Sequence, residues 1–113
     1  EKFYNKLLDT VGLKKIYSDE GCVGYGQKTG PEVVEFYITM PANGEPATYG
    51  NGTQISFLSN TRAEVDKFHA TGIENGGVCE GLPGLRPEGA STYYSYVRDL
   101  NGNKVCAYTD SKD

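Results

Sequence analysis

The stretch VRDLNGNKVCAYTD, residues 97–110, decides the fold. It places two runs of alternating apolar and polar residues on either side of an Asn-Gly pair at 101–102. Such a pair between alternating runs is a strong short-range signal for a β-hairpin. The stretch therefore predicts two antiparallel strands. In the second of them, Cys106 faces the opposite way from Val105 and Ala107, because successive side chains in a strand alternate between faces.

Length, charge and cysteine usage limit the classes of protein. The chain has 113 residues, a formal net charge of −4 and three cysteines without CxxC spacing. This length suits a single domain, 1–113, with one core. Lys and Arg are scattered, which predicts no nucleic acid partner, and no stretch approaches the roughly 20 apolar residues of a membrane span. Three cysteines without a disulfide or zinc pattern fit reduced thiols, so we expect a cytoplasmic protein.

The first half of the chain predicts one helix followed by three strands. Residues 1–10 place apolar side chains on one helical face, and Gly12 stands where a helix would end. The members of this face, with the next apolar residue, are Phe3, Leu7, Leu8 and Val11. Three short alternating runs follow at 12–18, 21–27 and 32–40. Residues 42–52 combine Pro, Gly and Asn with almost no aliphatic side chain, and we interpret them as the linker between the two halves.

The second half predicts a strand, a helix and three further strands. The strand covers 53–59, and the helix covers 59–73, with Ser59 or Asn60 as its cap and a capping box between Thr61 and Glu64. Its core side chains are expected to be Val65, Phe68 and Ile73. The remaining strands are expected at 78–81, 92–99 and 103–109, with a long loop over 81–91.

The order of elements repeats. A helix and three strands occur within 1–41 and again within 53–113, but the second unit starts with a strand that has no counterpart before Glu1. We therefore expect an α+β domain of two βαβββ units whose first leading strand is missing. A sheet edge would then be free, and a partner chain or further residues would have to cover it.

This organisation resembles the vicinal oxygen chelate superfamily, which includes glyoxalase I, bleomycin-resistance proteins and extradiol dioxygenases. The resemblance rests on FYNKLLDTVGLKK (3–15), AEVDKFHATGIENGG (63–77) and the turn RDLNGN (98–103). The turn is similar to the D-P-D-G-N turn of that superfamily, with Leu100 in place of Pro. The resemblance implies a curled mixed sheet that forms a cup around one site, and a homodimer, because family members commonly pair or exchange units.

The resemblance also implies where a metal would bind. In metal-dependent members the ligands, usually His or Gln and Glu, come from the first, fourth, fifth and eighth strands. Three of these positions match Glu35, Gln54 and Cys106, and the first-strand ligand has no counterpart here. One carboxylate, one amide and one thiol form a degenerate site for a hard divalent ion. We therefore expect no cofactor, although zinc, nickel, cobalt or manganese stays open.

Side-chain alternation gives a check that does not use the family. Val34, Phe36 and Ile38 share one face of their strand, and Glu35 lies on the other. The apolar faces of the strands, to which Ile55 and Phe57 are also assigned, should pack against the two helices, which leaves a concave face for a ligand. The residues expected to line this pocket are Tyr37, Gln54, Ser56, Tyr94, Tyr96, Cys106 and Tyr108. The alternative is that this face is simply solvated.

Two functions remain open from the sequence. The first is a metal-free module, similar to bleomycin-resistance proteins, that binds a small organic molecule. The second is a lyase or isomerase similar to lactoylglutathione lyase, in which a divalent ion polarises the carbonyl of a glutathione adduct and Glu35 moves the proton. His69 is expected on the helix surface outside the cup, and Cys22 and Cys79 are expected to be buried filler.

Overall fold

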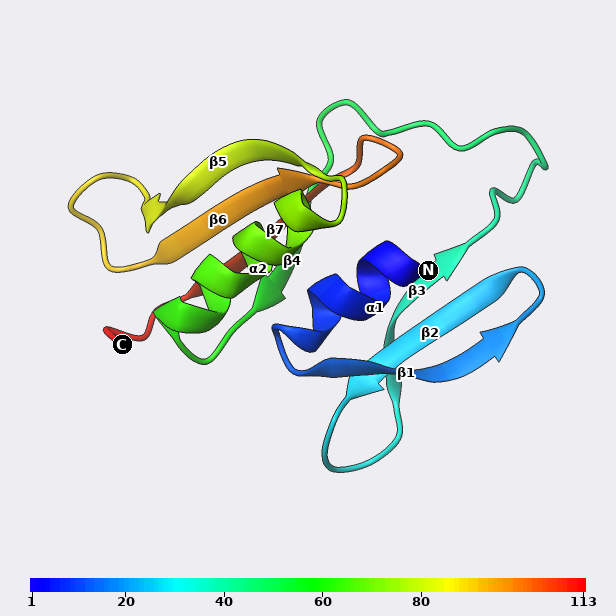
Figure 1. Cartoon of the computed structure of the whole chain (residues 1–113), viewed down its shortest axis with the longest axis horizontal. Coiled ribbons are helices and arrows are strands. Elements are labelled where there is room, and N and C mark those ends of the chain that lie inside the picture. The colour runs from blue at the N-terminus through cyan, green and yellow to red at the C-terminus, as the bar shows by residue number, and fades with distance from the viewer.

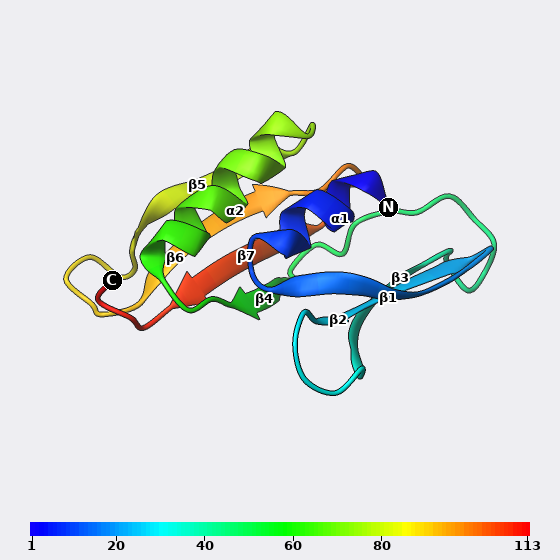
Figure 2. The same ribbon diagram turned by 60° about the horizontal axis from the view of Figure 1, so that its bottom comes forward.

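The computed structural model describes residues 1–113 and arranges them as two sheets with both helices on one side (Figures 1 and 2). In chain order the elements are α1 (Lys2–Asp9), β1 (Leu13–Asp19), β2 (Cys22–Gln27), β3 (Val34–Thr39), β4 (Ile55–Leu58), α2 (Arg62–Glu74), β5 (Val78–Leu85), β6 (Tyr93–Arg98) and β7 (Lys104–Thr109). Neither helix has the length and apolar character that a membrane span requires.

The two sheets differ by one strand. The first is the antiparallel meander β1-β2-β3, and the second has the order β4-β7-β6-β5. In the second sheet β4 lies parallel to β7, with Ile55 beside Val105 and Leu58 beside Tyr108, whereas the other pairs are antiparallel. The α+β prediction with a mixed sheet is confirmed. The second half is a complete βαβββ unit, and in the first half β3 has no strand on the edge that corresponds to the position of β4.

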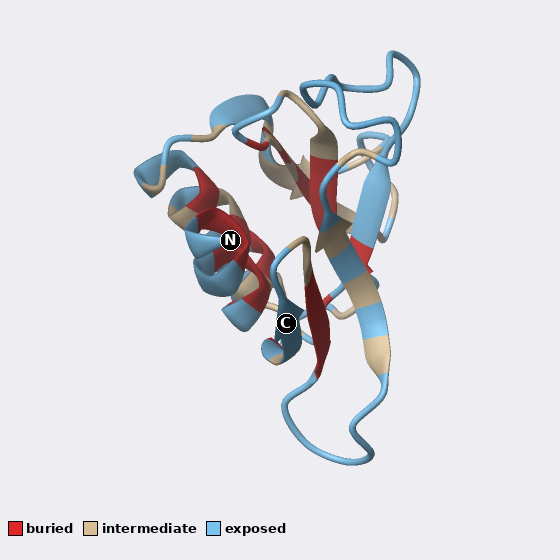
Figure 3. Ribbon diagram, turned by 90° about the vertical axis from the view of Figure 1, so that its right-hand side faces the viewer, coloured by how far each residue is buried: buried red, intermediate tan, exposed pale blue.

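The helices share one hydrophobic core. Figure 3 shows that the buried residues gather on the inner faces of the helices and on the strands beneath them. Leu7 and Leu8 of α1 and Val65 and Phe68 of α2 are fully buried, and they belong to the same cluster as Val105. Burial of one such side chain contributes about 1.5–3 kcal/mol. Because α1 and α2 also contact each other, the two halves stabilise one another through this core.

Thr61 and Glu64 together cap the N-terminus of α2. Thr61 is the N-cap, and its hydroxyl accepts from the Glu64 backbone N–H at 3.1 Å. The Glu64 carboxylate in turn accepts from the backbone N–H of Asn60 at 2.9 Å. The capping pair was therefore predicted correctly, but the assignment of Ser59 or Asn60 as the cap was wrong. Thr61 directly precedes the first helical residue and has an extended backbone. Its side chain accepts from the backbone N–H of Glu64, the third residue of the helix, as an N-cap side chain does.

The core stripe of α2 also differs from the prediction at its end. Val65, Phe68 and Gly72 are buried, and Ile73 is 40% exposed. Gly72 lies against Val97 and Leu7, at a site where an added Cβ would approach the Val97 methyl groups to 3.1 Å. Each helical position is rotated by about 100° from the last. Gly72 therefore occupies the inward position, and the expectation that Ile73 lies in the core was wrong.

Strand β5 extends beyond its predicted end. It runs to Leu85 and pairs with β6, and its register shifts around Gly81 and Gly84. These irregularities interrupt the alternation of side chains that marks a strand in sequence. The expected long loop over 81–91 was therefore wrong, and the segment without strand pairing begins at Arg86. The segment over 42–52, interpreted from the sequence as the linker, has no strand or helix and is exposed along its whole length.

The β-hairpin predicted from residues 97–110 is confirmed. Strands β6 and β7 pair antiparallel from Tyr93 beside Thr109 to Arg98 beside Lys104. Gly102 in the turn has a φ of +88°, a conformation that L side chains rarely adopt.

Candidate functional site

The face of the second sheet that the helices leave uncovered carries most of the predicted pocket residues. Ser95 and Val97 are buried on the helix side of β6, so the alternating Tyr94 and Tyr96 point the other way. Register then brings further side chains beside them, since paired residues share a face. We call this surface the tyrosine face and define it by Gln54, Ser56, Leu58, Tyr94, Tyr96, Lys104, Cys106 and Tyr108.

Three stacked tyrosines form the wall of this face. The rings of Tyr94 and Tyr96 are 5.8 Å apart with an interplanar angle of 9°, and those of Tyr94 and Tyr108 are 5.9 Å apart at 26°. All three side chains are half-buried, so part of each ring stays accessible. Such rings provide flat apolar area and a polar hydroxyl at one end, which suits recognition of a small organic molecule.

A polar trio of Gln54, Ser56 and Cys106 lies next to the tyrosines, and all three were expected from the sequence to line the pocket. The Gln54 amide donates to the Ser56 hydroxyl at 3.0 Å and to the Cys106 sulfur at 3.5 Å. The Cys106 thiol donates to the Ser56 hydroxyl at 3.1 Å. This convergence follows from the parallel pairing of β4 with β7, which sets Ser56 directly beside Cys106.

Cys106 is a covered thiol. Its side chain is 0% exposed, and burial raises the pKa of the thiol above its ordinary value. The thiol is therefore protonated at neutral pH, and its hydrogen bond to Ser56 uses that proton. A protonated, inaccessible thiol is neither a nucleophile nor a ready metal ligand. In this conformation the side chain fills space beneath Gln54 and Tyr96.

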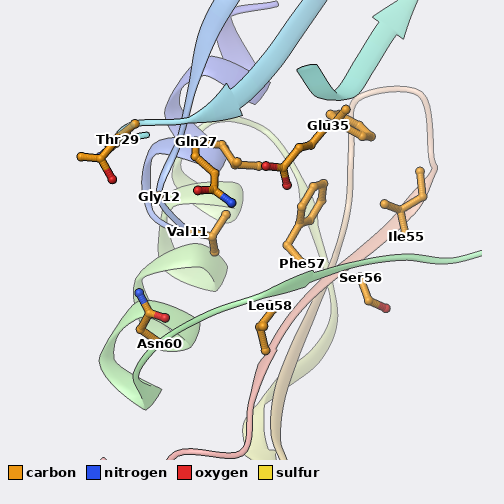
Figure 4. A pocket seen from close by; sticks show the side chains of 13 residues that line it. Val11, Gly12, Gln27, Thr29, Glu35, Ile55, Ser56, Phe57, Leu58 and Asn60 are labelled. Atoms are coloured by element: carbon orange, nitrogen blue, oxygen red, sulfur yellow. The ribbon is translucent and has the colours of Figure 1, made fainter. Parts of the chain in front are cut away.

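Glu35 lies in a different environment. It lines a pocket of about 580 Å³ between β3 and β4, together with Gln27, Phe36 and Phe57. Figure 4 shows that the Glu35 side chain extends into this pocket toward Gln27, and Ser56 also lines the pocket. Glu35 makes no hydrogen bond to the polar trio, whose bonds are all internal. The structure therefore joins Gln54, Ser56 and Cys106 by hydrogen bonds and leaves Glu35 outside this network, although Glu35 and Ser56 line the same pocket.

Tyr37 belongs to the other sheet, on β3. It is 53% exposed and lines a second pocket of about 580 Å³, beside Cys22, Met40 and the turn after β6. Glu35 and Tyr37 both lie on β3 in the first sheet, and neither forms a hydrogen bond with a residue of the tyrosine face. The roles assigned to them from the sequence remain predictions.

The comparisons with known proteins agree with this architecture. A scan against protein-family models gives no match, and a search of curated proteins gives none. The crystal structure of a glyoxalase/bleomycin resistance protein from Albidiferax ferrireducens T118 is 41% identical, covers 96% of this chain and 84% of that chain, and superposes with a TM-score of 0.80. The chain belongs to the glyoxalase/bleomycin resistance protein family. The resemblance stated from the sequence is thereby confirmed.

More distant structures share the fold of this family member. A glyoxalase-related enzyme from Fulvimarina pelagi is 16% identical with a TM-score of 0.68, and the match covers 96% of this chain and 76% of that chain. A glyoxalase/bleomycin resistance protein/dioxygenase family enzyme from Burkholderia phytofirmans PsJN is 15% identical with a TM-score of 0.69, and the match covers 97% of this chain and 87% of that chain. At these identities the similarity shows the architecture alone.

The residues at the metal-ligand positions implied by the resemblance do not form a cluster that could hold a divalent ion. No group of three or more His, Cys, Asp or Glu side chains is placed to hold an ion. Of the three positions that match the ligands, Cys106 is buried with a raised pKa, and Gln54 offers only a neutral amide oxygen, because its amide nitrogen donates to Ser56 and Cys106. Glu35 faces the other pocket. A hard ion needs several accessible oxygen or imidazole ligands that converge, and this set does not provide them.

Two cationic residues at the tyrosine face were missed from the sequence. The Lys104 ammonium lies 4.9 Å from the centre of the Tyr96 ring, and the Arg86 guanidinium lies 5.1 Å from it. Lys104 is two positions before Cys106, so the alternation of β7 could have assigned it to the same face. Arg86 carried no such signal, because it falls within the segment that was interpreted as a loop.

On the helix side, His69 and Cys79 lie together. The His69 Nε2 atom is 3.2 Å from the Cys79 sulfur, and Cys79 pairs with Val97, which is buried beneath α2. His69 is thus outside the tyrosine face, as predicted, and burial lowers its pKa. The expectation that Cys79 is buried filler was wrong, because β5 is at the edge of the sheet and leaves this thiol exposed. Cys22, for which the same was expected, is half-buried.

Proposed function

We propose that this member of the glyoxalase/bleomycin resistance protein family binds a small organic molecule on the tyrosine face, at a site where the family's metal ligands are degenerate. The stack of Tyr94, Tyr96 and Tyr108 carries this proposal. Three accessible rings that are ordered by their neighbours offer area to a flat ligand without the entropic cost of freezing mobile side chains. The polar trio at Ser56 stabilises the sheet behind the rings.

The pocket between β3 and β4 supports a small-molecule site less well. It runs along the free edge of β3, the place that β4 occupies in the other sheet. A free strand edge presents unpaired backbone N–H and C=O groups, which an added strand satisfies better than a small ligand. The prediction that a partner chain or further residues cover this edge still stands. We propose a homodimer on this ground, and light scattering on a sizing column measures the mass in solution.

A ligand screen tests the proposed function. Compounds that bind the native protein raise its melting temperature in a thermal-shift assay. We expect hits among flat aromatic compounds, and we expect Tyr94→Ala and Tyr108→Ala to abolish the shift. Tyr17→Ala is the control, because Tyr17 is an exposed tyrosine on β1. A hit that survives both tyrosine substitutions but is lost in Phe57→Leu would place the ligand in the pocket beside β3 and contradict the proposal.

The lyase hypothesis has a separate test. Formation of lactoylglutathione is measured with zinc, nickel, cobalt or manganese added to the purified protein. We expect no activity above background, because the residues present do not converge on an ion. Metal-dependent activity that Glu35→Gln abolishes would establish the lyase and overturn the metal-free proposal.

A further inference from the structure

The charges on the tyrosine face are unevenly compensated. Three ion pairs occur in the structure, and they join Lys15 to Glu1, Lys28 to Asp9, and Arg98 to Glu80. Neither Arg86 nor Lys104 takes part in an ion pair, although the chain as a whole has a formal net charge of −4. Lys104 does influence the carboxylate of Glu80, whose pKa is lowered mainly by Arg98 and to a smaller extent by Lys104. Two cations that form no ion pair therefore lie on one aromatic ring in an otherwise acidic protein.

Arg86 is held in place by neutral groups. Its guanidinium donates to the backbone carbonyls of Leu82 at 2.6 Å and Tyr94 at 3.1 Å. Gly81 makes room for this arrangement, because an added Cβ would lie 2.7 Å from the Tyr96 ring and 3.1 Å from the guanidinium. Backbone carbonyls fix the position of the guanidinium without neutralising its charge. The positive charge is therefore oriented and still available to a ligand.

The tyrosine face changes character along the strands. At one end Leu58, which is 63% exposed, pairs with Tyr108 and continues the apolar surface of the ring. At the other end Lys104 lies two positions before Cys106 and over Tyr96. A ligand that lies across the stack thus meets an apolar end and a cationic end. A ligand that fits this face should therefore have one apolar end and one end that complements the cations.

From these contacts we infer that the tyrosine face selects small aromatic molecules that carry an anionic group, such as an aromatic carboxylate. The ring stacks on Tyr94 and Tyr108, and the anion lies at Tyr96 within reach of Arg86 and Lys104. Charge-assisted hydrogen bonds are about twice as strong as neutral ones, so the charged group decides which flat molecules bind best. This inference rests on the proposed function and adds the charge class of the ligand to it.

Calorimetric titration with three ligands of similar shape tests the charge. The probes are 2-naphthoate, 2-naphthamide and 2-naphthylmethylammonium, which are anionic, neutral and cationic. We expect 2-naphthoate to bind about tenfold more tightly than the amide, and the cation to bind most weakly. Raising the salt concentration should weaken 2-naphthoate binding and leave that of the amide unchanged, because salt screens partly exposed charges.

Substitution of Lys104 identifies the charge that acts. Lys104→Met keeps most of the apolar stem and removes the ammonium, and it should remove most of the preference for 2-naphthoate over the amide. Lys14→Met on the exposed surface of β1 is the matched control and should leave the preference unchanged. If Lys104→Met does not fold, as judged by circular dichroism, the salt dependence of the native protein decides.

The outcomes separate this inference from the proposed function. If the amide binds as tightly as 2-naphthoate and both depend on Tyr94, the tyrosine face is a ligand site and the charge inference is wrong. If 2-naphthoate binds preferentially but independently of Tyr94, the anion is recognised elsewhere and the inference is also overturned. If none of the three probes binds at millimolar concentration, the inference fails, whereas the proposed function then depends on the wider screen.

Discussion

The Tyr4 hydroxyl donates a 2.6 Å hydrogen bond to the Asp99 carboxylate and so joins α1 to the turn between β6 and β7, 95 positions away in the sequence. Both residues are buried. The same carboxylate accepts from the backbone N–H groups of Asn101 and Asn103 at 2.9 and 2.8 Å. Asp99 therefore shapes the hairpin turn and also ties it to the first half of the chain. Burial, with the nearby Asp99, raises the pKa of Tyr4, which remains a donor.

Removing this hydroxyl should destabilise the fold. We expect Tyr4→Phe to lower the free energy of unfolding by about 1.5–3 kcal/mol, the range for hydrogen bonds to charged groups. Urea unfolding followed by circular dichroism measures the change. Tyr17→Phe is a close control, because Tyr17 also donates a 2.6 Å bond to an aspartate, Asp19, but at the surface and two positions away. Equal losses in the two variants would show that burial of the Tyr4 bond adds nothing.

A side chain at position 102 should also be costly. Gly102 has a φ of +88°, and an added Cβ would lie 3.0 Å from the Tyr49 ring. We expect Gly102→Ala to reduce stability by about 1–3 kcal/mol, since a non-glycine residue in this region is strained. Gly84→Ala serves as the comparison, because nothing lies within 4 Å of its added Cβ and its φ is not in the left-handed region. A neutral Gly102→Ala would mean that the turn can rearrange.

The three thiols should react in an order set by their exposure. Cys79 is exposed, Cys22 is half-buried and Cys106 is buried with a raised pKa. Titration of the native protein with Ellman's reagent should therefore detect Cys79 first and Cys22 more slowly, and guanidinium should be required for the third thiol. Cys79→Ser should remove the fast phase, and Cys106→Ala should leave the native reaction unchanged. Rapid labelling of Cys106 in the native protein would show that its cover opens readily.

The single histidine should give a pH dependence of stability. Burial lowers the pKa of His69 in the folded protein, so the unfolded chain takes up a proton first as the pH falls. The resulting stabilisation is present above the unfolded pKa of about 6.5 and is lost as the pH falls through the lower, folded pKa. We expect the melting temperature to fall more between pH 7.5 and 5 in the native protein than in His69→Gln. Parallel curves would assign the dependence to carboxylates instead.

Much of the fold was predictable because the local spacing of apolar and turn residues specifies it. The alternation of Val34, Phe36 and Ile38, and the Asn-Gly pair after Leu100, specify strands and a hairpin with little help from distant residues. The prediction was wrong where a single residue determines which side of a helix faces the core. Gly72, rather than Ile73, faces the core because a glycine allows close approach of α2 to β6, and no apolar pattern marks such a position.

The candidate site was predictable only within one sheet. Ser56 and Cys106 contact each other because the alternation of side chains along a strand places both on the same face. The pairing of β4 with β7 then sets the two residues side by side. Glu35 belongs to the other sheet, and its placement depends on packing between sheets, which strand alternation does not encode. Arg86 was missed because the shifts of register near Gly81 hide the end of β5.

The exposed linker over 42–52 has a consequence for how the polypeptide is connected. All of its residues are exposed, whereas the contacts that hold the halves together, such as those of Leu7 and Phe68, lie in the shared core. A protease that cuts within the linker breaks one covalent bond and leaves those contacts intact. The two fragments should therefore stay together, and fragment complementation or circular permutation at this segment should yield a protein with the same architecture.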